Sequence, residues 1–346
     1  MQNFKTDYKD YKDFVAIMIS TDRQIFNPKS AVRKRMIEQS QLYKFLHIII
    51  FSTKKFETEK ISENCTIYST NSNLRWNYVS NACKIGKKII KGITPDSQLL
   101  VTCQDPFETG LVGKCLSKLR RTSELMLQIH TDMFNPYFVK HSFLNRVRRF
   151  ISKYTLPQAD SVRVVSYKIA NFLLERGFKP EEIIVKPIPV DLDFIKNSIP
   201  SFNLKNKFPQ FKKIVLMVSR LESEKNISMA LMAWKKVLEK VNDVGLVIVG
   251  SGSELKKLKR LSYKLNISQN VVFEGWQTDL VPYYRGSDIF LSTSLYEGYG
   301  VVYKEAEASA LKIVSTDVGI AREIGAEIVD WKVEDIAQKL INNLNR

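Results

Sequence analysis

Histidine and cysteine are scarce in this chain of 346 residues, which has only three histidines and four cysteines. The cysteines, Cys65, Cys83, Cys103 and Cys115, all fall in the first third of the chain and form no C-x2-C pair. A zinc site needs closer spacing and histidine partners, so we expect no metal site and four reduced core thiols. Reduced thiols are typical of a cytoplasmic protein.

Long hydrophobic runs are also missing. The longest, His47–Phe51 and its neighbours, is far shorter than the roughly 20 apolar residues needed to cross a bilayer. The first residues, MQNFKTDYKDYKD, are polar with mixed charge and do not resemble a secretory signal. We therefore expect a loose tail over residues 1–13 and a cytoplasmic protein that is at most peripheral at the inner face of a membrane.

Acidic residues are outnumbered by basic ones, 36 against 53, which gives a formal net charge of +17. Such a balance predicts an anionic partner: nucleic acid, anionic lipid or a phosphorylated substrate. The deficit is deepest between Asp132 and Asp160, where no acidic residue occurs and a basic helix is expected over 139–154. The simpler interpretation of its apolar stripe is core packing, and the alternative is docking on anionic lipid headgroups. The stripe consists of Phe143, Val147, Phe150, Ile151 and Tyr154.

Short apolar runs alternate with helical patterns along most of the chain, from FVAIMIS at Phe14–Ser20 onward. This alternation predicts parallel βα units, and the length exceeds one typical domain. We therefore expect an α/β protein with two doubly wound, Rossmann-like domains that face a central cleft. The expected parts are a tail at 1–13, an N-terminal domain at 14–190, a proline-containing linker at 191–210, a C-terminal domain at 211–330 and a final helix at 331–346.

The stretch at 292–311, STSLYEGYGVVYKEAEASAL, combines a glycine turn with the start of a helix. Two glycines allow positive φ in the turn, and the first amides of a helix lack internal partners, so they suit a phosphate or a sugar oxygen. Glu297 and Glu305 stand in E-x7-E spacing and suit sugar or ribose hydroxyls. The alternative is that both are solvated surface charges.

Arg220 and Lys225 follow an apolar run directly, in the loop before a helix. Two cations placed there can hold a diphosphate and stabilise a leaving group. Gly250-Ser251-Gly252 lacks the third glycine of a dinucleotide fingerprint, so we interpret it as a tight strand-to-helix turn. Asp191-Leu192-Asp193 has D-x-D spacing, but we interpret it as capping or solvated acids rather than a metal site.

His130 and Asp105 each stand at the end of an expected strand. A histidine at the carboxyl end of a strand points into the ligand crevice, where it can bond a hydroxyl or share developing charge. A structural role is the alternative for both residues.

Taken together, these residues resemble the retaining glycosyltransferases of the GT-B fold, family 4 (glycosyl transferases group 1). SRLESEKN is similar to the basic diphosphate loop of that family, LYEGYGVVYKEA to its E-x7-E segment and LQIHTD to its N-domain histidine strand. The stretch Gly275–Ser294 is similar to the base-binding region, and the similarity covers Phe14–Gly325.

The resemblance implies transfer of a hexose-type sugar from a UDP- or GDP-linked donor, with retention of configuration and with no metal or other cofactor. It implies catalytic roles for His130 and Glu297 and an acceptor-side N-terminal domain, where Asp105 and Ser30 are candidates. The C-terminal domain would bind the diphosphate through Arg220, Lys225, Gly300 and Val301, the sugar through Glu297, Gly298, Tyr299 and Gly300, and the ribose and base through Glu305, Glu274, Gly275 and Trp276.

Two features depart from the family pattern. Lys29 and Ser30, in NPKSAV, replace a glycine pair in the loop after the first strand, and the chain ends soon after the helix expected at 333–344. The predicted acceptor is a glycan or a lipid-linked molecule in cell-surface glycan synthesis. A nucleic-acid-binding protein, suggested by charge alone, and a nucleotide-sugar epimerase of the same fold are the alternatives, although we expect no nucleic acid partner.

Overall fold

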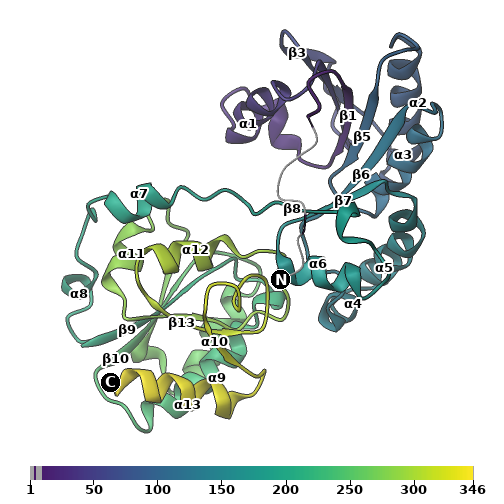
Figure 1. Ribbon diagram of the computed structural model, residues 1–346. Helices are drawn as coiled ribbons and strands as arrows, with labels where there is room; N and C mark the ends of the chain where they lie inside the picture. Colours follow the sequence, from purple (N-terminus) through teal and green to yellow (C-terminus); the bar gives the residue numbers. More distant parts are fainter. Residues whose placement is uncertain (1–3, 5–9, 346) are drawn as a thin grey trace. The chain divides into compact units, whose positions relative to one another are not determined.

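The computed structural model describes residue 4 and residues 10–345. The chain divides into two compact units, Met1–Lys186 and Pro187–Arg346 (Figure 1). Most of the tail expected over residues 1–13 lies outside the described residues. Near its end, Tyr11 is buried and its ring packs edge-on against Phe14 at 5.0 Å.

The first unit is built on a sheet of order β3-β4-β2-β1-β5-β6-β7-β8. All neighbouring strands are parallel except β3, which runs antiparallel to β4. In Figure 1, α1 lies on one side of this sheet and α2 and α3 on the other. The elements are β1 Val15–Ser20, α1 Ala31–Ser40, β2 Phe45–Ile50, β3 Glu59–Ser62, β4 Cys65–Ser69, α2 Tyr78–Lys91, β5 Leu99–Cys103, α3 Glu108–Ser117, β6 Ser123–Ile129, α4 Pro136–His141, α5 Phe143–Thr155, β7 Ser161–Val164, α6 Tyr167–Leu174 and β8 Ile183–Val185.

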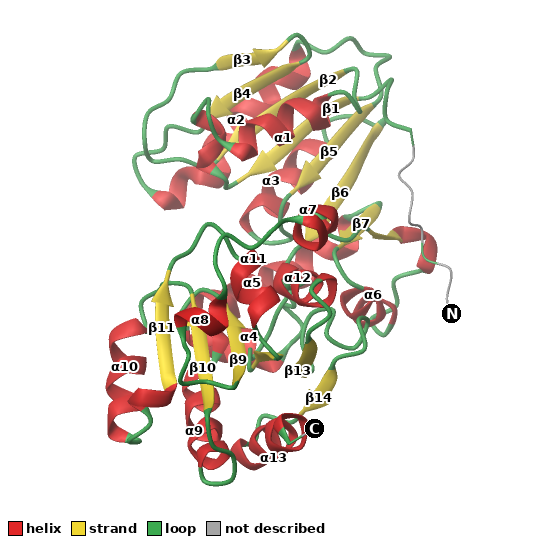
Figure 2. Ribbon diagram, turned by 90° about the vertical axis from the view of Figure 1, so that its left-hand side faces the viewer, coloured by secondary structure: helices red, strands yellow, loops and turns green. Residues whose placement is uncertain are grey.

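The second unit has a fully parallel sheet of order β11-β10-β9-β12-β13-β14. In Figure 1, α11 and α12 lie on one side of it and α9 and α13 on the other; Figure 2 shows the strands from a second direction. The elements are α7 Leu192–Asn197, α8 Leu204–Lys207, β9 Lys213–Val218, α9 Ile227–Leu238, β10 Val244–Val249, α10 Leu255–Lys264, β11 Val271–Gly275, α11 Val281–Gly286, β12 Ile289–Ser292, α12 Val301–Ala308, β13 Lys312–Thr316, β14 Glu327–Val329 and α13 Val333–Leu344.

Fully apolar strands form the cores, as parallel sheets covered on both faces require. In the first unit every residue of β1 and β5 is buried, and in the second unit every residue of β10. Trp234 of α9 is fully buried in the second core, where its indole N–H donates to the carbonyl of Asn270 at 3.2 Å. None of the helices in the described ranges is both long and apolar enough to cross a bilayer.

Two local expectations were wrong. The antiparallel β3 was not anticipated, because Glu59–Ser62 is polar and only partly buried. The helix expected over 139–154 is two helices, because Ser142 is extended and its hydroxyl caps α5 by accepting from the amide of Asn145 at 3.1 Å.

The segment 191–210 contains two helices that belong to the second unit. Leu204 of α8 is buried, and a Cβ at Gly286 of α11 would stand 2.4 Å from the Cβ of Leu204. Asp191 caps α7 by accepting from the amide of Phe194 at 2.9 Å. The final helix, α13, packs on α9 in the same unit.

Candidate functional site

The order of strands in the second unit selects one edge of the sheet for ligand binding. From β9 the chain moves to β10 on one side and later returns to β12 on the other, so the order reverses between β9 and β12. Ligands of doubly wound sheets bind outside the carboxyl ends of the strands at such a switch point. Arg220 follows β9 and Glu297 follows β12, so both predicted loops begin at this point.

The loop after β9 is held against the turn after β10. The amide of Leu221 donates to the carbonyl of Ser251 at 2.8 Å. A Cβ at Gly250, whose φ is +136°, would stand 1.8 Å from the carbonyl oxygen of Ser219, and a Cβ at Gly252 would stand 2.4 Å from that of Leu221. The two glycines are therefore needed for the close approach of two backbones, as in the tight turn predicted from the sequence.

Lys225 and Glu297 meet across the switch point. The Lys225 ammonium forms an ion pair with the Glu297 carboxylate, and these side chains are only 13% and 16% exposed. Ser294 also donates to the same carboxylate oxygen at 3.0 Å. Arg220 is placed differently, because its side chain is 69% exposed and pairs with Glu224 at 2.9 Å.

The glycine turn presents backbone donors at the start of α12. Gly300 has φ +84° and precedes the first helical residue, Val301. Among the described residues, no acceptor faces the amides of Gly298, Tyr299, Gly300 or Val301. Such a row of unpaired donors beside Lys225 is the arrangement that binds phosphate or sugar oxygens.

Glu305 lies on α12 with a different partner from Glu297. The hydroxyl of Tyr284, on α11, donates to Glu305 Oε2 at 2.6 Å. Partial burial raises the pKa of the Glu305 carboxyl, and the hydrogen bond from Tyr284 opposes that shift. The two acids of E-x7-E are thus held separately, and sequence reasoning missed Tyr284 because nothing in its surroundings distinguishes it from a core tyrosine.

The predicted base-binding residues lie at the end of β11. Glu274 forms an ion pair with Lys207 and accepts from the hydroxyl of Tyr283, two partners that the sequence did not indicate. The carbonyl of Gly275 accepts from the Gly250 amide at 2.7 Å. The side chain of Trp276 is 70% exposed, so its ring face is open to an aromatic ligand.

His130 in the first unit is part of a polar chain. The amide nitrogen of Gln128 donates to Thr102 at 2.9 Å, so its oxygen faces His130 and the imidazole Nε2 donates to it at 3.0 Å. Desolvation lowers the pKa of His130 to about 4, and the guanidinium of Arg163, which also bonds Gln128, lowers the pKa in the same direction. The imidazole is therefore neutral near pH 7, with Nδ1 left as an acceptor.

Asp105 and Ser30 follow β5 and β1, between which the strand order of the first unit reverses. Asp105 accepts from the amide of Phe107 at 2.8 Å, and burial raises the pKa of its carboxyl to about 6. Ser30 caps α1: its hydroxyl accepts from the amide of Arg33 at 3.1 Å and donates to the carbonyl of Gln24 at 2.6 Å.

A family model matches the unit that holds most of these residues. Residues 199–338 match the model described as glycosyl transferases group 1. The matched segment, which makes up most of the second unit, includes the loop of Arg220 and Lys225 and the whole E-x7-E segment.

Individual relatives align with more of the chain than the family model does. An alpha-monoglucosyldiacylglycerol synthase of Streptococcus pneumoniae is 28% identical over 62% of this chain and 51% of its own length. A UDP-Gal:alpha-D-GlcNAc-diphosphoundecaprenol alpha-1,3-galactosyltransferase of Escherichia coli is 30% identical over 61% of this chain and 56% of its own. The chain thus spans about half the length of these relatives.

Solved structures extend the fold likeness to both units. A sucrose-phosphate synthase from Thermosynechococcus elongatus has a TM-score of 0.72 at 18% identity and covers 96% of this chain and 90% of its own. Alr3699/HepE of Anabaena, in complex with UDP and glucose, has a TM-score of 0.68 at 16% identity over 95% and 89% of the two chains. The expected GT-B fold, with two Rossmann-like α/β units, is confirmed.

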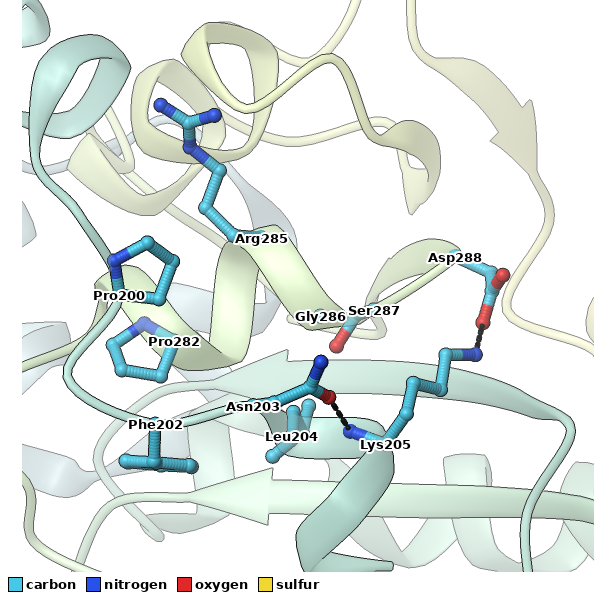
Figure 3. A pocket seen from close by; sticks show the side chains of 10 residues that line it. All are labelled: Pro200, Phe202, Asn203, Leu204, Lys205, Pro282, Arg285, Gly286, Ser287 and Asp288. Atoms are coloured by element: carbon cyan, nitrogen blue, oxygen red, sulfur yellow. Dashed lines mark hydrogen bonds and ion pairs between the residues drawn. The ribbon is translucent and has the colours of Figure 1, made fainter. Parts of the chain in front are cut away.

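A separate cavity of about 460 Å³ lies between α8 and α11 in the second unit (Figure 3). Asp288, at its edge, precedes β12 and bonds both Lys205 at 2.6 Å and the amide of Ile214 at 2.7 Å. Asp288 and Ile214 lie at the starts of their strands, whereas Lys225 and Glu297 follow strand ends. The predicted donor residues are therefore not part of this cavity.

Proposed function

We propose that this protein is a retaining, metal-independent glycosyltransferase that moves a hexose-type sugar from a nucleotide-sugar donor to a glycan or lipid-linked acceptor. The observation that carries the proposal is the pairing of Lys225 with Glu297 beside the unpaired amides of Gly298–Val301. This cluster stands at the switch point of the second unit, within the segment that matches the group 1 model. It offers a cation and backbone donors to a diphosphate, and a carboxylate to a sugar.

Donor binding exchanges one ion pair for another. The diphosphate replaces Glu297 as the ion-pair partner of the Lys225 ammonium. The released Glu297 carboxylate then accepts hydrogen bonds from the sugar hydroxyls. The amides of Gly300 and Val301 bind a phosphate oxygen, with Arg220 supplying a second cation from the loop after β9. Glu305 would bind the ribose, and the exposed face of Trp276 would stack on the base.

In the transfer step, the bond from the anomeric carbon to the diphosphate oxygen breaks, and a bond to the acceptor oxygen forms on the same face of the sugar. The acceptor proton passes to the departing diphosphate oxygen, so charge and atoms balance without a protein base. Lys225 and the turn amides stabilise the negative charge that grows on the leaving group. His130, neutral and oriented through Gln128, is proposed to bond a hydroxyl of the donor sugar.

The relatives suggest which compounds to test first. The name of the Streptococcus pneumoniae relative gives a diacylglycerol product. The name of the Escherichia coli relative gives a UDP-Gal donor and a diphosphoundecaprenol-linked acceptor. We therefore propose UDP-linked donors before GDP-linked ones, a lipid-linked acceptor, a role in cell-surface glycan synthesis and a site of action at the cytoplasmic face of the membrane.

The test is a panel of UDP- and GDP-sugars, assayed for nucleoside diphosphate release with and without a chelator, on lipid-linked acceptors. We expect release with one donor class, resistance to the chelator, and an anomeric proton signal in the product with the configuration of the donor. An inverted product would overturn retention. An epimerised sugar with no new linkage would favour the epimerase, and salt-dependent DNA retention with no turnover would favour nucleic-acid binding.

A further inference from the structure

Helix α5 of the first unit has its apolar side exposed and its polar side buried. Phe143, Phe150 and Tyr154 are 78%, 74% and 55% exposed, whereas Asn145 and Ser152 on the opposite face are buried. Phe143, Val147, Phe150 and Tyr154 share one face, because residues three or four apart in a helix are neighbours. The interpretation of this stripe as core packing is therefore wrong for these residues; Ile151 alone of the stripe is partly buried.

Polar contacts explain this orientation. The Asn145 side chain donates to the carbonyl of Phe138 at 2.9 Å, and the Thr155 hydroxyl donates to the carbonyl of Pro106. Arg148 forms an ion pair at 3.1 Å with Glu108 of α3. The inner face of α5 is thus fixed by hydrogen bonds to neighbouring segments, and turning the apolar face inward would leave these buried groups without partners.

Cations flank the exposed apolar face. Arg146 and Lys153 are exposed, and neither makes an ion pair with a residue in the described part of the chain. The Lys114 ammonium lies 3.2 Å from the centre of the Tyr154 ring, which adds a third cation at one end of the face. Since no acidic residue occurs between Asp132 and Asp160, the surface has no carboxylate of its own segment to neutralise it.

We propose that this face of α5 docks on an anionic lipid bilayer. The rings of Phe143, Phe150 and Tyr154, with Val147 between them, enter the interface, while Arg146 and Lys153 bind headgroup phosphates or carboxylates. The charge favours an anionic bilayer, rather than a second copy of this chain, as the partner of this face. Two such faces would bring their cations together, and the whole chain carries +17. The docking would hold the first unit, the proposed acceptor side, at the surface from which a lipid-linked acceptor is taken.

The test is cosedimentation of the full chain with vesicles of phosphatidylcholine alone or with added phosphatidylglycerol, at low and high salt. We expect binding only to the anionic vesicles, and a fall of about tenfold or more in the partition coefficient for Phe143→Ser with Phe150→Ser. Arg146→Glu with Lys153→Glu should lose binding similarly and respond less to salt. Nucleotide-induced thermal shifts, which report the second unit, should be unchanged in both variants, so that failure here is separable from failure of the proposed activity.

Matched controls come from exposed positions elsewhere. Trp76→Ser with Ile199→Ser removes two apolar side chains that are 89% and 90% exposed, and Lys256→Glu with Lys259→Glu makes the same charge change on α10. Both controls should bind vesicles like the unaltered protein. Equal losses in controls and α5 variants would reject a site on α5 in favour of diffuse charge. No vesicle binding, with oligomers that the Phe143→Ser and Phe150→Ser pair disperses, would show that a second copy covers the face.

Discussion

Lys225 and Glu297 are 72 positions apart in the chain, yet their charged groups form an ion pair in which both side chains are largely buried. The pair joins the loop after β9 to the turn after β12, and the Leu295 amide, which donates to the carbonyl of Glu224 at 2.8 Å, joins the same two segments. A buried ion pair holds each charged group in place for a ligand. Removal of one member leaves the other charge without a partner.

The first prediction concerns Lys225→Ala. We expect the affinity for UDP or GDP to fall about 10- to 100-fold, because one charge-assisted bond to the diphosphate is lost. Stability should fall as well, since Glu297 keeps a carboxylate with little exposure and loses its cation. Isothermal titration with the diphosphate, together with the melting temperature, measures both effects.

Glu297→Gln separates diphosphate binding from sugar binding. The amide keeps the shape and the bond from Ser294 but not the charge, so we expect diphosphate affinity to be retained or raised while turnover of the sugar donor drops. Lys304→Ala, which breaks an i,i+3 pair with Glu307, is the matched control for Lys225→Ala and should leave diphosphate affinity unchanged. Wild-type affinity in Lys225→Ala would remove the basis of the proposed site.

The second prediction concerns Tyr284→Phe. The hydroxyl of this fully buried tyrosine donates to Glu305, and without it a partly buried carboxylate loses its donor. We expect destabilisation of about 1–3 kcal/mol and a further rise in the pKa of Glu305. Because Glu305 is the proposed ribose ligand, KM for the donor should rise more than kcat falls. Chemical denaturation and steady-state kinetics check the two parts.

Tyr263→Phe is a suitable control, because this hydroxyl belongs to a side chain that is 77% exposed. It should change neither stability nor KM. If Tyr284→Phe lowered stability but left KM for the donor unaltered, Glu305 would be a structural residue, and the ribose assignment would be withdrawn.

Sequence patterns were sufficient for most of the elements and for the two loops that lie at the switch point. Apolar runs predicted most strands, and glycines at 298 and 300 together with Lys225 marked the loops that the switch point brings together. Partners across the fold could not be predicted in this way. Tyr284 lies in the short helix α11 and Lys207 in the segment expected as a linker, and only tertiary packing shows that they bond Glu305 and Glu274.

The orientation of α5 illustrates a second limit of pattern reasoning. Periodicity places Phe143, Val147, Phe150 and Tyr154 on one face but does not say whether that face points inward. The orientation of α5 is determined by Asn145, Ser152 and Thr155, because their buried polar groups bond nearby carbonyls. Similarly, the polar β3 pairs with β4 through its backbone, which leaves no apolar signal to detect.

The third prediction concerns Gly300→Ala. Gly300 has φ +84°, and a Cβ there would stand 2.5 Å from the ring of Tyr303, so the substitution adds both backbone strain and a clash. We expect a loss of about 1–3 kcal/mol of stability and a larger loss of donor turnover, because the amides at the start of α12 shift. Denaturation and turnover of the donor measure these effects.

Gly325→Ala is the matched control for strain alone. Gly325 has φ +73°, but nothing lies within 4 Å of a Cβ built there. Gly325→Ala should lose stability, but its turnover per folded molecule should be unchanged. Equal effects of the two substitutions on turnover per folded molecule would mean that the turn at Gly300 does not bind the donor.

The last prediction is a pH dependence that arises from Asp105. Burial raises the pKa of this carboxyl from its ordinary 3.8 to about 6 in the folded protein. Between these values the folded state binds more protons than the unfolded state, so this group lowers stability as pH rises from about 4 to about 6. The full effect is roughly 2–3 kcal/mol. Asp105→Asn keeps an acceptor for the Phe107 amide and cannot ionise, so its stability advantage over the unaltered protein should grow across that window and level off above it.

Denaturation at a series of pH values measures the difference, with Asp96→Asn at an exposed position as the control. A pH-independent difference would show that the carboxyl is not desolvated. Higher stability combined with lost turnover would indicate that the charge is retained for the acceptor side of the reaction, because functional sites commonly hold groups that destabilise the fold.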